Sequence, residues 1–147
     1  MFEVTKEFIF DAAHYLPGHE TCGQMHGHTY RVLVTFEGML LSRHGMLIDF
    51  GFIKEVVGPL IDCLDHSVLN TVLQDSSLSI ETEDGIDDWR TENPTAENLA
   101  YILYQLILGG LEVYFTGYAP LATLKRVTVY ETPTSYASYT KSLRGNN

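Results

Sequence analysis

The feature that most constrains this chain is a set of three histidines placed where two strand-like segments meet. His26 and His28 stand two residues apart at the entrance of the second segment, so both side chains project to the same face of a strand. Gly27 between them lets the backbone approach closely. His14 ends the first segment, which begins at Phe8. All three rings can share one ion if the two segments pair as antiparallel neighbours, and we expect that pairing.

The same histidines predict a metal centre. Residues 14–28 hold four of the six histidines of the chain, which random scatter explains poorly. Three imidazoles without an obvious fourth ligand leave a zinc ion one open position, as in catalytic zinc sites. Surface histidines without a metal are the alternative, since a lone His-x-His pair is weak evidence. The chain has no His-Glu-x-x-His helix, and Glu37 lies too far along for the carboxylate of a cupin site.

Length and composition predict a single domain over residues 1–147. The chain has 147 residues, 45% of them hydrophobic, which is enough to bury a core. Its first seven residues carry charges where a signal peptide has an apolar run, and no stretch approaches the roughly 18 apolar residues of a membrane helix. We therefore expect a cytoplasmic protein that does not bind a membrane, with Cys22 and Cys63 as thiols.

The charge of the chain is negative and unevenly spread. Nine basic and nineteen acidic side chains give a formal net charge of -10, which argues against binding nucleic acid or an anionic membrane through a basic surface. Seven acids and one base fall between Asp75 and Glu92. A site elsewhere can still hold an anionic substrate through local cations, and those available include Lys6, Arg31, Lys54, Lys125 and Arg126.

Hydrophobic periodicity predicts an α+β fold. Residues 2–13, 29–37 and 124–132 have the pattern of strands, whereas 51–64 and 95–109 have that of helices. These elements make a small antiparallel β-sheet with two helices on one face. Such a sheet has exposed edges, which are usually covered or paired with another chain, so we expect a homo-oligomer built by strand pairing.

Single residues indicate where these elements end. Gly58-Pro59 should kink the first helix or restart it at the proline. Thr95 has the character of an N-cap, and Gly109-Gly110 should end the second helix. Pro133 closes the last strand. A loop that carries Cys22 connects the first two strands.

Four motifs follow one another along the chain. They are Phe8-x-Phe-x-Ala-Ala-His14, Cys22-Gly-x-x-His26-Gly-His28-x-Tyr30, Leu64-Asp65-His66-x-x-Leu69-Asn70, and Asn93-Pro94-Thr95-x-Glu97 with Glu131-Thr132-Pro133-Thr134-Ser135 downstream. In this order the chain resembles the 6-pyruvoyltetrahydropterin synthase family over most of its length. The Cys-x-x-x-His-Gly-His spacing and the Glu-Thr-Pro-Thr-Ser-Tyr ending resemble the bacterial 6-carboxytetrahydropterin synthases of queuosine biosynthesis more than the animal enzymes.

The resemblance implies a tunnelling fold, in which antiparallel strands of several subunits join into a barrel with sites at the subunit interfaces. It implies a hexamer of two stacked trimers that binds Zn2+ through three histidines. The implied substrate is 7,8-dihydroneopterin triphosphate, from which the family eliminates triphosphate. The bacterial branch also cleaves the side chain, which gives 6-carboxy-5,6,7,8-tetrahydropterin and acetaldehyde.

The resemblance also assigns roles to seven residues of this chain. The zinc ligands would be His14, His26 and His28, the catalytic base Cys22, its relay Asp65 and His66, and the anchor of the pterin ring Glu131. In this arrangement His66 reaches the Cys22 of an adjacent subunit. The chemistry is reasonable, because a proton that leaves a carbon beside a metal-bound hydroxyl needs an acceptor, and a nearby cation favours a thiolate.

The residues alone leave alternatives to these roles. Cys22 could bind zinc directly, which would close the open position and make the metal structural. Asp65 and His66 could be the end of a helix, where the dipole favours a histidine, and adjacent residues on an extended backbone point apart. Glu131 could be a strand-edge glutamate in water, although a carboxylate on an apolar strand face needs partners such as the paired N–H groups of a pterin.

Residues 71–93 depart from the family pattern, in which many relatives have a short connection at this point. Loops of this length tend to be functional or disordered. An acidic insertion beside a triphosphate site would repel the substrate, so we expect it to lie away from the pocket or to be mobile. Two other functions stay open, namely a 6-pyruvoyltetrahydropterin synthase without carbon–carbon cleavage and a zinc- or pterin-binding protein without turnover.

Overall fold

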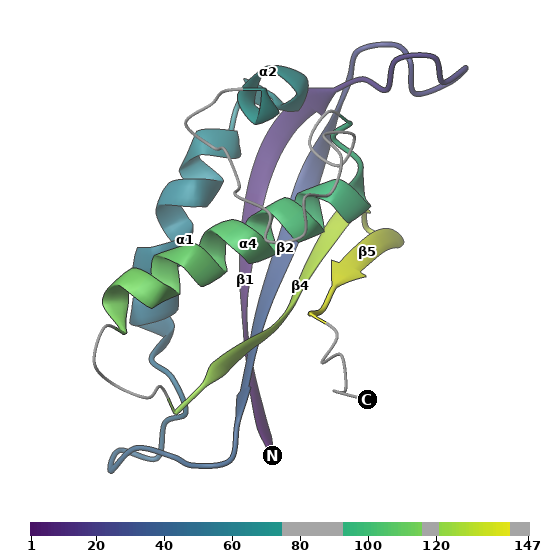
Figure 1. The fold of residues 1–147 in the computed structure, drawn as a ribbon. Helices are drawn as coiled ribbons and strands as arrows, with labels where there is room; N and C mark the ends of the chain where they lie inside the picture. The colour runs from purple at the N-terminus through teal and green to yellow at the C-terminus, as the bar shows by residue number, and fades with distance from the viewer. Residues whose placement is uncertain (75–92, 116–120, 142–147) are drawn as a thin grey trace, which may run out of the picture.

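The computed structural model describes residues 1–74, 93–115 and 121–141. Its strands form one sheet in the order β3-β1-β2-β4-β5, and the helices lie on one face of it (Figure 1). The elements are β1 (Phe2–His14), β2 (His26–Gly38), α1 (Phe50–Leu64), β3 (Ser67–Val68), α2 (Leu69–Leu73), α4 (Ala96–Tyr114), β4 (Thr123–Thr132) and β5 (Ser135–Tyr139). The predicted α+β class is confirmed.

The two long strands β1 and β2 pair along their whole length. Their antiparallel register runs from Phe2 opposite Gly38 to His14 opposite His26. The expected pairing of the two histidine-bearing segments is therefore confirmed. β2 begins at His26, three residues before the predicted start at Thr29, because its backbone continues the ladder with β1 to the end of both strands.

The other strands extend the sheet unequally. β4 pairs antiparallel with β2, and β5 pairs antiparallel with β4. β3 pairs parallel with β1, through Ser67 and Val68 alone. The sheet is thus mixed, which differs from the purely antiparallel expectation. Over the described residues it does not close on itself, and β5 and most of β1 present free edges.

Helix α1 packs against the sheet on both sides of its proline. The carboxylate of Asp49 accepts a hydrogen bond from the N–H of Gly51 at 2.6 Å and caps the helix start. The helix continues through Pro59, so of the two predicted alternatives, a kink or a restart at the proline, the restart is wrong. Val57 before the proline and Ile61 after it are both buried, and their packing holds the two parts in one helix.

Helix α4 has the predicted start and a later end. The hydroxyl of Thr95 accepts a hydrogen bond from the N–H of Asn98 at 3.2 Å, as expected of an N-cap. The helix then passes through Gly109-Gly110 to Tyr114, so its predicted end at the glycines is wrong. Two glycines inside a helix cost about 2 kcal/mol relative to alanine, and the burial of Leu111 beyond them contributes a free energy of similar size.

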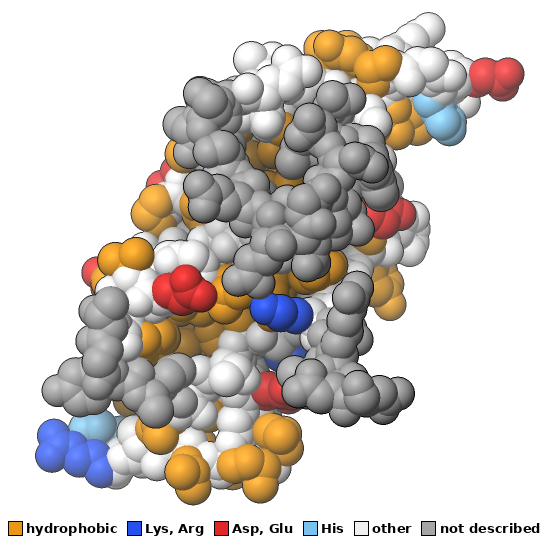
Figure 2. Space-filling model, viewed as in Figure 1, with side chains coloured by type: hydrophobic (Ala, Val, Ile, Leu, Met, Phe, Trp, Pro, Cys, Tyr) orange, Lys and Arg blue, Asp and Glu red, His pale blue; other side chains and the backbone are white. Residues whose placement is uncertain are grey.

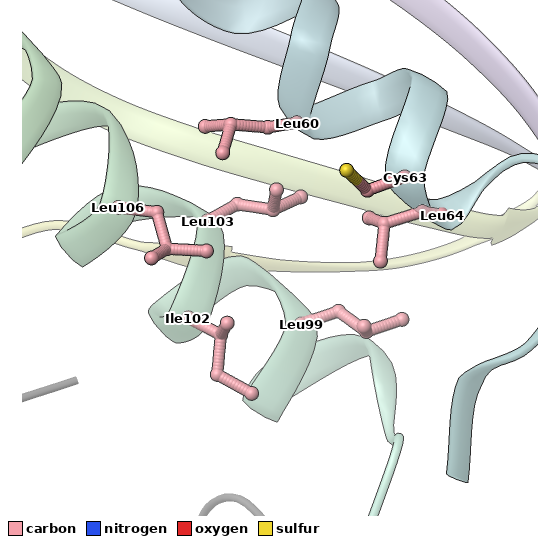
Figure 3. A pocket seen from close by; sticks show the side chains of 7 residues that line it. All are labelled: Leu60, Cys63, Leu64, Leu99, Ile102, Leu103 and Leu106. Carbon is pink, nitrogen blue, oxygen red and sulfur yellow. The ribbon is translucent and has the colours of Figure 1, made fainter. Parts of the chain in front are cut away.

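The core lies between the sheet and the two long helices. Figure 3 shows a hollow between α1 and α4, lined by Leu60, Cys63, Leu64, Leu99, Ile102, Leu103 and Leu106. Its volume of 10 Å³ is about the minimum that a single water molecule needs, so it is a packing gap rather than a ligand site. None of the helices within the described ranges is long and apolar enough to cross a membrane.

The two ends of the sheet differ in character. The end opposite the histidines carries the β2–α1 connection, where exposed apolar side chains gather (lower part of Figure 2), and these include Met39, Leu40, Leu41 and Met46. At the histidine end, α2 is tied to the end of β1. The buried side chain of Asn70 accepts a hydrogen bond from the N–H of Tyr15 at 3.0 Å and donates one to its carbonyl oxygen at 2.8 Å.

The insertion expected at residues 71–93 begins with a helix. α2 reaches Leu73, so residues 71–73 are not part of a loop. Residues 75–92, which hold the acidic side chains, lie outside the described residues.

Candidate metal centre

Three histidines and one glutamate converge where β1 ends and β2 begins. One ligating atom from each of His14, His26, His28 and Glu131 lies within 4.8 Å of all the others. The Nε2 atoms of His14 and His26 are 3.0 Å apart, and Nε2 of His28 is 3.2 Å from Oε1 of Glu131. The register explains this convergence, because His14 faces His26 across the strand pair and His28 shares the strand face of His26.

Backbone carbonyls determine which nitrogen of two of the rings carries the hydrogen. Nδ1 of His14 lies 2.8 Å from the carbonyl oxygen of Pro94, and Nδ1 of His26 lies 2.7 Å from that of Gln24. A carbonyl can only accept, so both Nδ1 atoms donate, and each neutral ring has its lone pair at Nε2. An outer hydrogen bond of this kind orients most metal-binding histidines.

The inward nitrogens fit a metal ion. Two lone pairs 3.0 Å apart repel unless a proton or a metal ion lies between them. Two nitrogens bound tetrahedrally to one zinc ion stand roughly 3.3 Å apart, which is close to this separation. Nε2 of His28 is buried without a hydrogen-bond partner among the described residues. Burial also lowers the pKa of His28, which favours the neutral form that binds metals.

Glu131 belongs to this cluster, although the sequence did not place it there. It lies at a register shift between β4 and β5, and such a bulge can re-aim a side chain. Its Oε1 is 3.2 Å from Nε2 of His28 and 3.9 Å from Nε2 of His14. The carboxylate therefore lies where a fourth ligand of a metal ion would stand, and equally where it could hold a substrate beside such an ion. The pairing of β4 with β2 decides this, and the sequence does not specify that register.

Cys22 is close to the candidate metal-binding histidines in the sequence, but it lies outside the ligand cluster. It is half-buried on the loop between β1 and β2, which extends beyond the end of the sheet (Figure 1). Its Sγ atom is not among the donor atoms that lie within 4.8 Å of one another. The N–H of Cys22 donates a hydrogen bond to Nδ1 of His19 at 3.0 Å. His19 thus contacts the predicted base.

Asp65 and His66 form a second cluster with the backbone of β1. Asp65 ends α1, and His66 has a φ of 56°, in the left-handed region that most residues avoid. This turn brings Nδ1 of His66 to 2.9 Å from Oδ2 of Asp65, although neighbours on an extended backbone would point apart. The other carboxylate oxygen accepts the N–H of Asp11 at 2.9 Å. These hydrogen bonds, that of Asp11 first, lower the pKa of Asp65.

The two clusters do not meet within one chain. The N–H of His66 donates to the carbonyl oxygen of Asp11 at 2.6 Å, so His66 lies at the edge of β1, directly before the short strand β3 that pairs there. The side chain of Asp11 alternates along β1 with the buried Phe10 and Ala12, and so lies on the sheet face opposite the histidine cluster. The Cys22 loop projects away from the junction of α1 and α2 (Figure 1). The side chain of His66 is 80% exposed.

The chain matches known proteins along nearly its whole length. A family model described as 6-pyruvoyl tetrahydropterin synthase matches residues 3–142. The 6-carboxy-5,6,7,8-tetrahydropterin synthase of Bacillus subtilis is 32% identical, over 99% of this chain and 90% of the relative. The protein of the same description from Haemophilus influenzae is 30% identical, over 95% of this chain and 99% of the relative.

A solved structure has the same fold. The 6-pyruvoyl tetrahydropterin synthase of Caenorhabditis elegans superposes with a TM-score of 0.69 at 24% identity, over 97% of this chain and 98% of that one. The order of strands and the helices on one face of the sheet are therefore those of a tunnelling fold.

Proposed function

This chain belongs to the 6-pyruvoyl tetrahydropterin synthase family, and we propose that it is a zinc-dependent lyase of queuosine biosynthesis. The reaction is the conversion of 7,8-dihydroneopterin triphosphate to 6-carboxy-5,6,7,8-tetrahydropterin, with release of triphosphate and acetaldehyde. The names of the relatives that span most of the chain support this product. The observation that carries the proposal is the pair of inward Nε2 lone pairs, 3.0 Å apart, beside the buried Nε2 of His28, which makes no hydrogen bond with the described residues.

The metal centre is the fixed part of the proposed site. His14, His26 and His28 hold the zinc ion, with their outer hydrogen bonds keeping two of the rings in the ligating orientation. Bound there, zinc supplies a Lewis acid for the hydroxyl groups of the substrate side chain. Glu131 accepts the ring N–H and the exocyclic amino group of the pterin, which places the ring beside the metal.

The proton transfers fall to Cys22, Asp65 and His66. The thiolate of Cys22 takes the proton from the carbon next to a substrate hydroxyl group. The carboxylate of Asp65 accepts the Nδ1–H of His66 and so leaves Nε2 of that ring free to exchange a proton with the thiol. Because the Asp65–His66 pair is exposed at the edge of β1, the Cys22 that it serves belongs to an adjacent subunit.

Subunit assembly follows from the open sheet in this proposal. The free edges at β1 and β5 pair between copies, so that the strands close into a barrel. The complete assembly is a homo-oligomer, a hexamer of two stacked trimers with each site at a subunit interface. Each chain contributes one domain, residues 1–147, and the protein works in the cytoplasm.

One incubation tests this reaction. Zinc-replete protein is mixed with 7,8-dihydroneopterin triphosphate, the pterin product is identified by mass, and the solution is assayed for acetaldehyde. The proposal expects the 6-carboxy product and acetaldehyde in equal amounts. A 6-pyruvoyl product without acetaldehyde would instead support the reaction named for the family. An unchanged substrate would contradict the proposed reaction and support a zinc- or pterin-binding protein without turnover.

A further inference from the structure

The loop between β1 and β2 contains a histidine that the proposed reaction does not use. We propose that His19 is a positioning residue, whose ring holds the backbone of Cys22 and so orients the thiol. This inference rests on the proposed function, because Cys22 is the base in that reaction. His19 itself is exposed and is not one of the metal-binding residues.

The hydrogen bonds of the loop converge on Cys22. Nδ1 of His19 accepts the N–H of Cys22 at 3.0 Å, and the carbonyl oxygen of Cys22 accepts the N–H of Leu16 at 2.7 Å. The next amide, that of Gly23, donates to the carbonyl oxygen of His19 at 2.9 Å. Both main-chain polar groups of Cys22 are therefore bonded within the loop. No strand of the described sheet supports this residue, so these bonds determine its position.

A glycine in the loop allows the backbone of His19 to lie close to the residue that follows Cys22. A Cβ atom at Gly23 would lie 2.3 Å from the carbonyl oxygen of His19, a distance that no side chain tolerates. A glycine after the cysteine is thus required for the turn that brings the ring of His19 to the Cys22 amide. The ring and the carbonyl oxygen of His19 consequently accept hydrogen bonds from two successive amides, those of Cys22 and Gly23.

The position of the acceptor atom distinguishes this role from a general effect on the loop. Only Nδ1 of His19 contacts the Cys22 amide, so Nε2 carries the ring hydrogen and points elsewhere. The amide oxygen of asparagine stands close to where Nδ1 stands, whereas that of glutamine stands close to Nε2. His19→Asn therefore preserves the acceptor, and His19→Gln and His19→Ala remove it.

Turnover kinetics provide the first test, with the zinc-loaded protein and 7,8-dihydroneopterin triphosphate. We expect His19→Ala and His19→Gln to lower kcat about tenfold, the effect of losing one hydrogen bond that positions a reacting group. KM should change by less than about twofold, because His19 does not contact the substrate in this proposal. His19→Asn should recover most of kcat. His44→Ala, a second exposed histidine on the β2–α1 connection, is the matched control and should leave both constants unchanged.

Thiol reactivity provides a test that does not need turnover. In a Cys63→Ser background Cys22 is the single thiol of the chain, so its alkylation by iodoacetamide can be followed by mass. We expect the rate constant to change about threefold or more in His19→Ala and His19→Gln, and to stay near the parental value in His19→Asn, since orientation and environment control thiolate attack. Zinc content and Tm should remain those of the parent.

The possible results separate the two proposals. If the parent protein shows no turnover, the proposed function fails, and the order of alkylation rates still tests His19. Equal kcat values and alkylation rates in all three His19 variants and the parent would overturn the positioning role. So would recovery by His19→Gln in place of His19→Asn, or loss of zinc in His19→Ala, because these results would assign the effect to Nε2 or to the metal centre.

Discussion

The two clusters of ionisable side chains are held in opposite ways. The histidine cluster sits on the paired strands β1 and β2, where His14 is 1% exposed and the register places each ring. The Asp65–His66 pair lies at the edge of β1 beside the short strand β3, with the side chain of His66 80% exposed and its backbone in the left-handed region. The comparison indicates that the donor atoms of the first cluster converge within one chain, whereas the side chain of His66 in the second is exposed on the surface of that chain.

The energetics of the two clusters differ as well. Hydrogen bonds to the carbonyl oxygens of Pro94 and Gln24 orient the rings of His14 and His26, and burial lowers the pKa of His28. His66 instead carries backbone strain, which costs about 1–2 kcal/mol for a residue with a Cβ atom. Strain of this kind persists where the surrounding structure imposes it and is common at functional sites.

The largest effect is expected from removal of a residue of the buried cluster. His14→Ala should reduce zinc content from one ion per chain to about a tenth or less and lower turnover by at least about 10⁴-fold, because one of three ligands is lost. Elemental analysis after dialysis, together with the turnover assay, measures both quantities. His44→Ala serves as the control. Zinc retained at one ion per chain in His14→Ala would place the metal elsewhere.

The second effect tests whether Cys22 and the Asp65–His66 pair act together across chains. Cys22→Ala should lower turnover about 10²–10³-fold, the contribution of a general base, while zinc stays bound. His66→Ala should also be impaired. Mixing the two impaired proteins under conditions that exchange subunits should restore part of the activity, since some interfaces then combine an intact Cys22 with an intact His66. Absence of any recovery after proven exchange would locate both residues of one site in the same chain.

A smaller effect separates function from stability at the exposed pair. His66→Gly should lower turnover about tenfold or more, yet raise the free energy of unfolding by about 1 kcal/mol, because glycine adopts a positive φ without strain. Chemical denaturation and the turnover assay give the two values. In contrast, His14→Gly should lower both. A His66→Gly protein that is less stable than the parent would show that the side chain contributes more than its strain costs.

The smallest effect is a difference in pH dependence between the clusters in the metal-free protein. The pKa of His28 in the folded protein lies below its ordinary 6.5. As the pH falls below about 6.5, His28 is therefore protonated in the unfolded chain before it is protonated in the folded one. Stability then decreases until the pH passes the folded pKa. The pKa of Asp65 lies below 3.8, and its contribution is lost only below about pH 4. Thermal unfolding measured against pH should show that His28→Gln lacks the decrease in stability below about pH 6.5. Asp65→Asn should lack the decrease below about pH 4.

Much of the fold was predictable because its elements carry local signals. The alternation of β1 and β2 and the N-cap at Thr95 specify their elements through neighbouring residues. The errors arose where packing overrode local preference. α4 continues through Gly109-Gly110, and α1 through Pro59, because buried residues follow on the same helix face. The two-residue strand β3 leaves too short a pattern to be recognised.

The candidate site was likewise predictable where it depends on local signals and not where it depends on tertiary contacts. His14, His26 and His28 could be grouped from their spacing, since residues two apart on a strand share a face and a hairpin brings both strand ends together. The approach of Glu131 depends on the pairing of β4 with β2 and on the bulge at its own position. The contact of Asp65 with His66 depends on one positive φ angle. The bond from Cys22 to His19 depends on the turn of the loop.

The sequence by itself determined which residues share a strand face, which donor types are available for a metal, and which family the motifs resemble. These properties follow from the chain geometry of a few neighbouring residues. Only the tertiary structure decided that a carboxylate from the far end of the chain stands beside the histidines and that the Asp65–His66 pair points away from them. Both outcomes depend on strand register and sheet edges, which are set by contacts between residues distant in sequence.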